Sequence, residues 1–295
     1  MTRPRILITG RDGQLGWELA QSLAPLGEVT ATSRAELDLA SDDSIRAAVR
    51  RVQPQLIVNA AAYTAVDRAE SEMQMAQRIN ADAVATLAAE AKAVGAAVIH
   101  YSTDYVFDGA KAAPYVEGDT PMPLNVYGRT KLAGEQALAA AGISWLVLRT
   151  SWIYGTRGKN FLLTVLKLAA EKPELRIVAD QTGAPTAAKE IAVATAAIAE
   201  HWMNSRDRSG IYHLTAAGET SWHGFASEAM RLRSIATPTE KFARLIPIPT
   251  SEYPTPAARP RNSRLDCSRL EQDFGVRLPD WKISLADTVR HLDNV

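Results

Sequence analysis

The chain has 295 residues, of which 46% are hydrophobic and 22% are charged, a composition typical of globular proteins that excludes low-complexity disorder. The 33 basic and 33 acidic residues cancel to a formal net charge of zero, which excludes a global positive field that would attract nucleic acid. The apolar run near the start is too short for a signal-peptide core, and no stretch approaches membrane-spanning length. The single cysteine, Cys267, allows neither an internal disulfide nor a multi-cysteine metal site. We therefore expect a cytoplasmic protein with no nucleic-acid or membrane partner.

Short apolar runs alternate with helical periodicity through the first half of the chain. The sequence predicts strands at 5–9, 28–32, 56–59, 97–102 and 144–149, and helices at 14–26, 41–52, 76–94 and 125–141. This alternation is typical of right-handed βαβ units. We expect an α/β fold with a doubly wound parallel sheet (a Rossmann fold) over residues 1–150.

The alternation loosens after Thr150. Helices are predicted at 161–170 and 191–203 and a strand at 210–214, and we expect the elements between about 175 and 215 to return to the first domain. Residues 151–295 otherwise form a smaller, mainly substrate-binding lobe. Five prolines between Leu245 and Arg264 exclude a regular helix or a central strand there, so this segment is predicted to be an ordered binding loop.

A glycine-rich turn, Gly10-x-x-Gly13-x-x-Gly16, follows the first strand and opens the first helix. Such a turn lets the backbone approach a pyrophosphate, to which the helix N-terminus offers N–H donors. The sequence therefore predicts dinucleotide binding here, with Asp12, Gln14 and Leu15 as the intervening contacts.

The second strand ends in Thr32-Ser33-Arg34, the place where such folds select NAD or NADP. An arginine accommodates a 2′-phosphate, so Arg34 favours NADPH, whereas Ser33 suits either cofactor and a solvated Arg34 is the alternative. We predict NADPH, with NADH tolerated. After the third strand, the small side chains of Ala60, Ala61 and Ala62 would let the backbone pass close to the cofactor.

Tyr127 and Lys131 are four residues apart in a predicted helix, so both side chains project from one face. A free tyrosine has a pKa near ~10, and a nearby ammonium lowers it toward the working range of an acid–base group. Thr103, at the end of the preceding strand, is placed to hydrogen-bond a substrate carbonyl. The alternative is an ordinary surface pair, but the order of glycine turn, hydroxyl and Tyr/Lys pair favours a catalytic site.

The spacing of the three glycines resembles that of extended short-chain dehydrogenases/reductases. Six further segments, spread over essentially the whole chain, resemble the dTDP-4-dehydrorhamnose reductase family: 59–67, 101–109, 123–135, 149–154, 180–186 and 259–266. The resemblance implies an NADPH- or NADH-dependent oxidoreductase that reduces the C4 keto group of dTDP-4-dehydro-L-rhamnose to dTDP-L-rhamnose, for cell-surface polysaccharide such as lipopolysaccharide O-antigen.

The resemblance also implies residue roles. Thr103, Tyr127 and Lys131 match the catalytic hydroxyl, proton donor and lysine. The cofactor contacts that it implies are Gly13, Gln14, Leu15, Ser33, Asp38, Leu39, Ala62, Tyr63 and Thr64. The sugar contacts are Asp104, Tyr105 and Trp152, and the nucleotide-diphosphate contacts are Arg259, Asn262 and Arg264. The alternative for Trp152 is a buried structural tryptophan, and the alternative for Arg259 and Arg264 is a solvated surface charge.

Three other functions stay open. A 4,6-dehydratase would carry Asp-Glu after the threonine, where this chain has Asp104-Tyr105, so elimination chemistry is disfavoured. The three alternatives are another sugar-nucleotide 4-reductase, an epimerase that retains NAD, and a non-catalytic regulatory subunit of the methionine adenosyltransferase type. The exact sugar stereoisomer is not fixed by the sequence.

Some relatives bind Mg2+ through glutamates at a dimer interface. Glu18 fits one such position, but Lys189 and His291 stand at the other two, although Glu190 is adjacent to one. We therefore expect no metal site, and a homodimer is left open.

Overall fold

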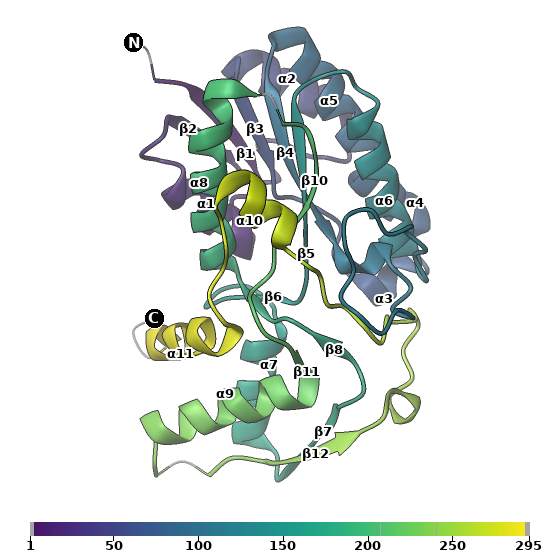
Figure 1. Ribbon diagram of the computed structural model, residues 1–295, viewed down its shortest axis with the longest axis vertical. Coiled ribbons are helices and arrows are strands. Elements are labelled where there is room, and N and C mark those ends of the chain that lie inside the picture. Colours follow the sequence, from purple (N-terminus) through teal and green to yellow (C-terminus); the bar gives the residue numbers. More distant parts are fainter. Residues whose placement is uncertain (1–2, 207, 240, 293–295) are drawn as a thin grey trace.

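A six-stranded parallel sheet forms the larger body of the computed structural model, which describes residues 3–206, 208–239 and 241–292 (Figure 1). Its strands run in the order β10-β5-β4-β3-β1-β2, and every pairing is parallel. The strand bounds are β1 Arg5–Thr9, β2 Glu28–Thr32, β3 Leu56–Asn59, β4 Ala97–Thr103, β5 Trp145–Thr150 and β10 Gly210–His213. The predicted doubly wound α/β sheet is confirmed.

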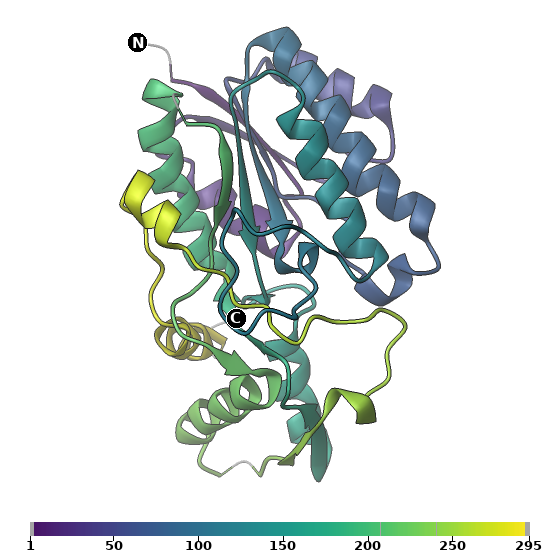
Figure 2. The same ribbon diagram turned by 45° about the vertical axis from the view of Figure 1, so that its right-hand side comes forward.

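Helices cover both faces of this sheet (Figures 1 and 2). Ile6 and Ile8 of β1 point to one face, where they join a core with α1 (Gln14–Ser22) and α8 (Ala188–Ser205). Leu7 points to the other, toward α2 (Asp42–Val52), α5 (Ala83–Val94) and α6 (Val126–Ala139). Apolar side chains on both faces of each strand are typical of parallel sheets buried between helices.

The helix predicted at 76–94 is broken by one π-helical turn. It consists of α4 (Met73–Gln77), the π segment η1 (Arg78–Asp82) and α5. The carbonyl oxygen of Asn80 in η1 lies so close to α6 that a Cβ at Gly134 would be 2.2 Å from it. The π turn and Gly134 together therefore allow close packing against α6, which periodicity alone does not predict.

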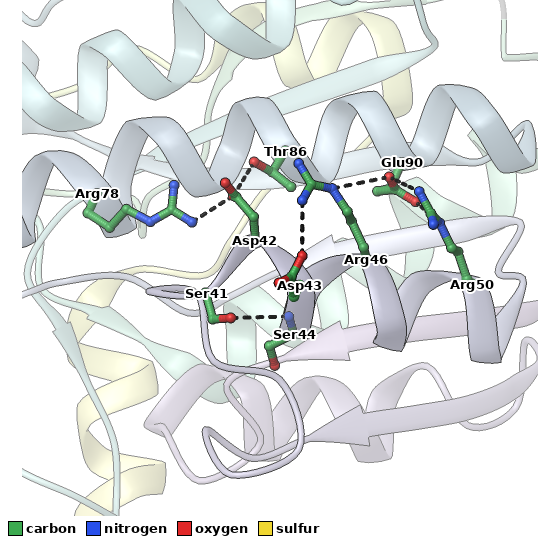
Figure 3. Close-up of polar contacts among 9 residues, drawn as sticks. All are labelled: Ser41, Asp42, Asp43, Ser44, Arg46, Arg50, Arg78, Thr86 and Glu90. Atoms are coloured by element: carbon green, nitrogen blue, oxygen red, sulfur yellow. Dashed lines mark hydrogen bonds and ion pairs between the residues drawn. The ribbon is translucent and has the colours of Figure 1, made fainter.

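Hydrogen bonds and ion pairs join α2 to η1 and α5 (Figure 3). Ser41 caps the start of α2 by accepting a hydrogen bond from the N–H of Ser44. Asp42 accepts a hydrogen bond of 2.6 Å from Arg78, and Arg50 makes two bonds of 2.8 and 2.9 Å to Glu90. These partly buried contacts join α2 to η1 and α5 through groups of opposite charge.

A smaller body lies beyond the carboxyl ends of the strands (Figures 1 and 2). It contains α7 (Phe161–Glu171), α9 (Trp222–Ala236) and α11 (Trp281–Leu292), and its own apolar core includes Tyr154, Phe225 and Leu285. Its strand pairs are β7 (Glu174–Val178) with β12 (Arg244–Ile248), β6 (Ile153–Tyr154) with β9 (Thr186–Ala187), and β8 (Thr182–Gly183) with β11 (Thr220–Ser221). The sequence pattern did not predict β7, α9 or α11.

The proline-rich segment contains β12 and a 3-10 turn, η3 (Thr250–Glu252). Because β12 pairs only with β7, the exclusion of a central strand agrees with the structure. Past η3 the chain returns along the larger body to α10 (Ser268–Phe274), as Figures 1 and 2 show. Short α3 (Val66–Ala69) and the 3-10 turn η2 (Asp104–Val106) follow the ends of β3 and β4.

The chain passes between the two bodies more than once. After α7, helix α8 packs on the face of the first sheet and β10 pairs with β5, and Leu270 of α10 joins the same core. Among the described residues, no helix is both long and apolar enough to cross a bilayer.

Candidate active site

A cavity of about 820 Å³ lies where the strands of the large sheet end, the usual ligand position in open α/β sheets. The loops after β1 to β5 and the start of α6 enclose it. Its walls include these residues singled out in the sequence: Gly10, Asp12, Gly13, Gln14, Leu15, Arg34, Asp38, Leu39, Ala60, Ala61, Ala62, Thr64, Thr103, Asp104, Tyr105, Tyr127, Lys131 and Trp152. The structure thus brings most of the predicted site residues together.

The glycine turn closes on itself at one edge of the cavity. Gly10 has a φ of +77°, and a Cβ at Gly16 would lie 2.0 Å from the carbonyl oxygen of Gly10. Gly16 is therefore needed for the tight packing of the turn and does not line the cavity. Gly13 opens α1 without any side-chain cap, which leaves room at the helix N-terminus for a phosphate group.

The end of β2 presents one guanidinium to the cavity. Arg34 lines it with its side chain 75% exposed, and its Nε lies 3.6 Å from Asp38. Ser33 instead donates from its backbone N–H and its hydroxyl to Glu36, at 2.8 Å in both cases. Glu36 also pairs with Arg11 at 3.2 Å. Of the two residues predicted to choose the cofactor, only Arg34 faces the cavity.

Packing at the start of α6 brings Tyr127 beside Thr103. Asn125 caps the helix by accepting a 2.8 Å hydrogen bond from the N–H of Gly128. A Cβ at Gly128 would lie 2.1 Å from the carbonyl oxygen of Tyr105, so glycine allows this first turn to rest on η2. The rings of Tyr105 and Tyr127 meet edge to face, with centroids 5.5 Å apart.

The electrostatics of the catalytic group follow from burial. Desolvation raises the pKa of Tyr127 to about 12, against a hydrogen bond with Thr103 that lowers it. Burial also lowers the pKa of Lys131 to about 8, with Glu135 acting in the opposite direction. Burial raises the pKa of Asp104 to about 6, despite hydrogen bonds from Ser263 and Thr103 that lower it. Such shifts in a cleft are typical of functional groups.

The sequence analysis missed the partner of Lys131. Its Nζ lies 3.1 Å from Nε2 of His100, a buried residue on β4. His100 immediately precedes the segment 101–109 that carries the resemblance, but a histidine in a strand gives no sequence signal that it meets a lysine 31 residues away.

Trp152 forms a flat wall of the cavity. It has a positive φ of 49° and stacks on Trp222 of α9, with ring centroids 3.6 Å apart and planes 11° from parallel. The Trp222 Nε1–H donates to Gln181 at 3.1 Å. Trp222 also lines the cavity, and the sequence analysis missed it.

A second cavity of about 420 Å³ adjoins the first in the smaller body. Tyr105 and Trp222 line both cavities. Arg259 lines the second one and makes two hydrogen bonds, of 3.1 and 2.7 Å, to the Asp67 carboxylate. A guanidinium therefore lines the cavity that adjoins the one with the catalytic side chains.

Three predicted contacts point elsewhere. Asn262 donates from its amide to the carbonyl oxygens of residues 111 and 113, and Arg264 pairs with Glu219 at 2.8 Å. The Tyr63 hydroxyl donates to Glu72 at 2.6 Å. None of the three lines either cavity. Through the contacts just given, Asn262 and Arg264 hold the loop that carries Arg259 against neighbouring segments.

The surface around Glu18 does not fit a magnesium site. Lys189 Nζ lies 2.9 Å from Oδ2 of Asp287, and His291 also pairs with Asp287 at 3.6 Å. Over residues 3–206, 208–239 and 241–292, no group of three or more histidine, cysteine or acidic side chains could hold a metal ion. The Lys189 ammonium lies beside the Asp287 carboxylate and acts electrostatically on Glu18.

The comparisons with known proteins agree along the whole chain. The family described as "RmlD substrate binding domain" matches residues 4–294. The dTDP-4-dehydrorhamnose reductase of Burkholderia thailandensis is 50% identical, over 98% of this chain and 99% of its own, and that of Escherichia coli K12 is 45% identical over 97% of each.

Solved structures show the same relationship. The dTDP-4-dehydrorhamnose reductase from Bacillus anthracis in complex with NADP has a TM-score of 0.89 and 32% identity, over 99% of this chain and all of that one. The UDP-glucose 4-epimerase of Thermus thermophilus has a TM-score of 0.81 at 19% identity, over 99% of each chain, which shows the fold alone. The chain belongs to the dTDP-4-dehydrorhamnose reductase family.

Proposed function

We propose that the protein reduces the C4 carbonyl of dTDP-4-dehydro-L-rhamnose to dTDP-L-rhamnose, with NADPH or NADH as the reductant. The observation that carries the proposal is a single cavity that holds the glycine turn together with Thr103, Tyr127 and Lys131. Family membership supplies the substrate, which the cavity alone does not name.

The residues present fit a dinucleotide. The Gly10–Gly16 turn would hold the pyrophosphate, and the alanines at 60–62 leave space for the backbone to approach the cofactor. Arg34 would bind the 2′-phosphate of NADPH. When bound, the reduced nicotinamide supplies the hydride that becomes the hydrogen on C4.

Tyr127 donates its phenolic proton to the oxygen of the carbonyl as negative charge develops there. Thr103 holds the same oxygen with its hydroxyl. A phenolate in this buried place is costly, since burial is the main cause that raises the pKa of Tyr127 to about 12. The Lys131 ammonium offsets that cost, because a nearby positive charge favours the phenolate.

The two adjoining cavities suit the two ends of a nucleotide sugar. The deoxysugar would lie against Trp152 in the larger cavity, with Asp104 and Tyr105 near its hydroxyls. The nucleotide would extend into the 420 Å³ cavity, where the Arg259 guanidinium, oriented by Asp67, would donate its remaining N–H groups to the diphosphate. Asn262 and Arg264 would support that loop.

We also propose a cytoplasmic location, which the single cysteine supports. We further propose a homodimer, because the apolar side chains of Trp17 on α1 and Val193 on α8 are exposed. Sedimentation of the purified protein tests the dimer.

Turnover of dTDP-4-dehydro-L-rhamnose, followed by the absorbance of NADPH, tests the activity. An epimerase would keep NAD bound through purification and consume no NADPH. A regulatory subunit would give no turnover without its partner enzyme.

A further inference from the structure

A chain of buried polar side chains runs under the catalytic lysine. Lys131 Nζ lies 3.1 Å from His100 Nε2, and the other ring nitrogen, Nδ1, lies 3.0 Å from Nδ2, the nitrogen of the Asn59 amide. The Thr9 hydroxyl donates to the amide oxygen, Oδ1, at 2.6 Å and accepts a 3.1 Å bond from the N–H of Ala61. The chain crosses β4, β3 and β1 and ends at the cofactor side of the cavity.

The four side chains are almost fully buried, with 1% of Thr9, Asn59 and His100 and 2% of Lys131 exposed. Thr9, Asn59 and His100 line neither cavity, so water cannot replace a missing partner there and their hydrogen bonds have to be made within the protein. The proton positions of the chain are therefore fixed by one another.

A neutral imidazole has one N–H and one acceptor nitrogen. If Nε2 accepts from the Lys131 ammonium, Nδ1 must carry the ring proton and donate it to the oxygen end of the Asn59 amide. This requires the Asn59 amide to be turned over from the orientation described above, an exchange of oxygen and nitrogen that keeps the shape of the group. The amide nitrogen then donates to Thr9 Oγ1. Lys131, His100 and Asn59 each then donate to the next group toward Thr9. The Thr9 hydroxyl, which accepts from Asn59 and from Ala61, then has to donate to a group outside these four side chains.

We propose that His100 is a positioning residue for Lys131: it accepts a hydrogen bond from the ammonium as the Nδ1–H tautomer, and Asn59 fixes that tautomer. One N–H of the Lys131 ammonium is thereby bound to the His100 ring on β4, which leaves the other two to face the cavity. The inference deepens the proposed function and rests on the role given there to Lys131.

The ring stays neutral under working conditions, because burial and the charge of Lys131 hold the pKa of His100 well below its ordinary value. Other titratable groups surround the pair. Glu135 on α6 acts on Lys131 but is engaged by Arg149 of β5 at 2.9 and 2.6 Å. Asp104 and Tyr105 of η2 lie beside Tyr127.

The first test compares two substitutions. His100→Phe keeps a planar ring but offers no acceptor, so we expect kcat to fall about tenfold and the alkaline limb of its pH profile to move down by about one pH unit. His100→Gln places an amide oxygen near the position of Nε2, and should restore most of kcat and return the limb to within a few tenths of a unit. His201→Phe, at an exposed histidine of α8, is the matched control and should change neither.

A normal pH limb in a folded His100→Phe protein, or equal damage in the Phe and Gln variants, would overturn the proposal. Since the Phe variant can fail to fold, 15N spectra of the histidines in the unaltered protein give a second measurement. We expect His100 as a neutral Nδ1–H tautomer from about pH 6 to 9, whereas an Nε2–H tautomer would contradict the proposal. The spectra need no substrate, so they separate this inference from a failure of the proposed reaction.

Discussion

The two cavities were assembled from the chain in different ways. Most of the larger one comes from short segments at the ends of consecutive strands, whose glycines, alanines and Tyr/Lys pair stand in recognisable order. The smaller one joins distant segments, as in the contact of Asp67 with Arg259, 192 residues further on. Local motifs therefore specify the catalytic side, whereas tertiary folding specifies the nucleotide side.

Loss of the tyrosine hydroxyl should have the largest effect, on the catalytic side alone. We expect Tyr127→Phe to lower kcat about 1000-fold, because the general acid is removed, while NADPH affinity stays nearly unchanged. Steady-state kinetics and a fluorescence titration of NADPH measure the two quantities. Near-normal turnover would sink the catalytic assignment.

On the nucleotide side, Arg259→Ala should raise the KM for the dTDP-sugar about 50-fold, since charge-assisted hydrogen bonds to the diphosphate would be lost. The KM for NADPH should not change. Arg264→Ala is the comparison variant, because Arg264 supports the same loop without lining the cavity, and we expect a smaller rise. Equal effects of the two would remove the distinction between contact and support.

Gly16→Ala tests the fit of the glycine turn. The new Cβ would meet the Gly10 carbonyl at 2.0 Å, so we expect the free energy of unfolding to fall by about 2 kcal/mol and NADPH binding to weaken. Gly118→Ala is the matched control, since a Cβ there meets nothing within 4 Å. Urea denaturation measures both, and indistinguishable variants would contradict the close approach.

The smallest effect should come from the end of β2. Arg34→Ala removes the guanidinium expected to bind the 2′-phosphate, and should raise the KM for NADPH about tenfold. The KM for NADH should stay the same. Arg277→Ala, on an exposed arginine, controls for the loss of charge, and a parallel rise for NADH would show that Arg34 does not read the phosphate.

The sheet and its order of elements could be predicted because burial on both faces leaves a continuous apolar signature in each strand. The π turn at Asn80 could not, because the 3.6-residue pattern passes through it. Trp222 and His100 were missed for a related reason: their roles depend on Trp152 and Lys131, which only the folded chain brings near them. Asn262 and Arg264 show the converse. They lie in a segment that resembles the family, yet they support the loop that carries Arg259 and line neither cavity.

The most direct test of the central claim is a turnover with NADPH deuterated at the hydride position of its nicotinamide ring. With dTDP-4-dehydro-L-rhamnose as substrate, the account predicts dTDP-L-rhamnose that carries deuterium on C4, in equal amount to the NADPH oxidised. Product without deuterium, or no oxidation of NADPH by the folded protein, would contradict it.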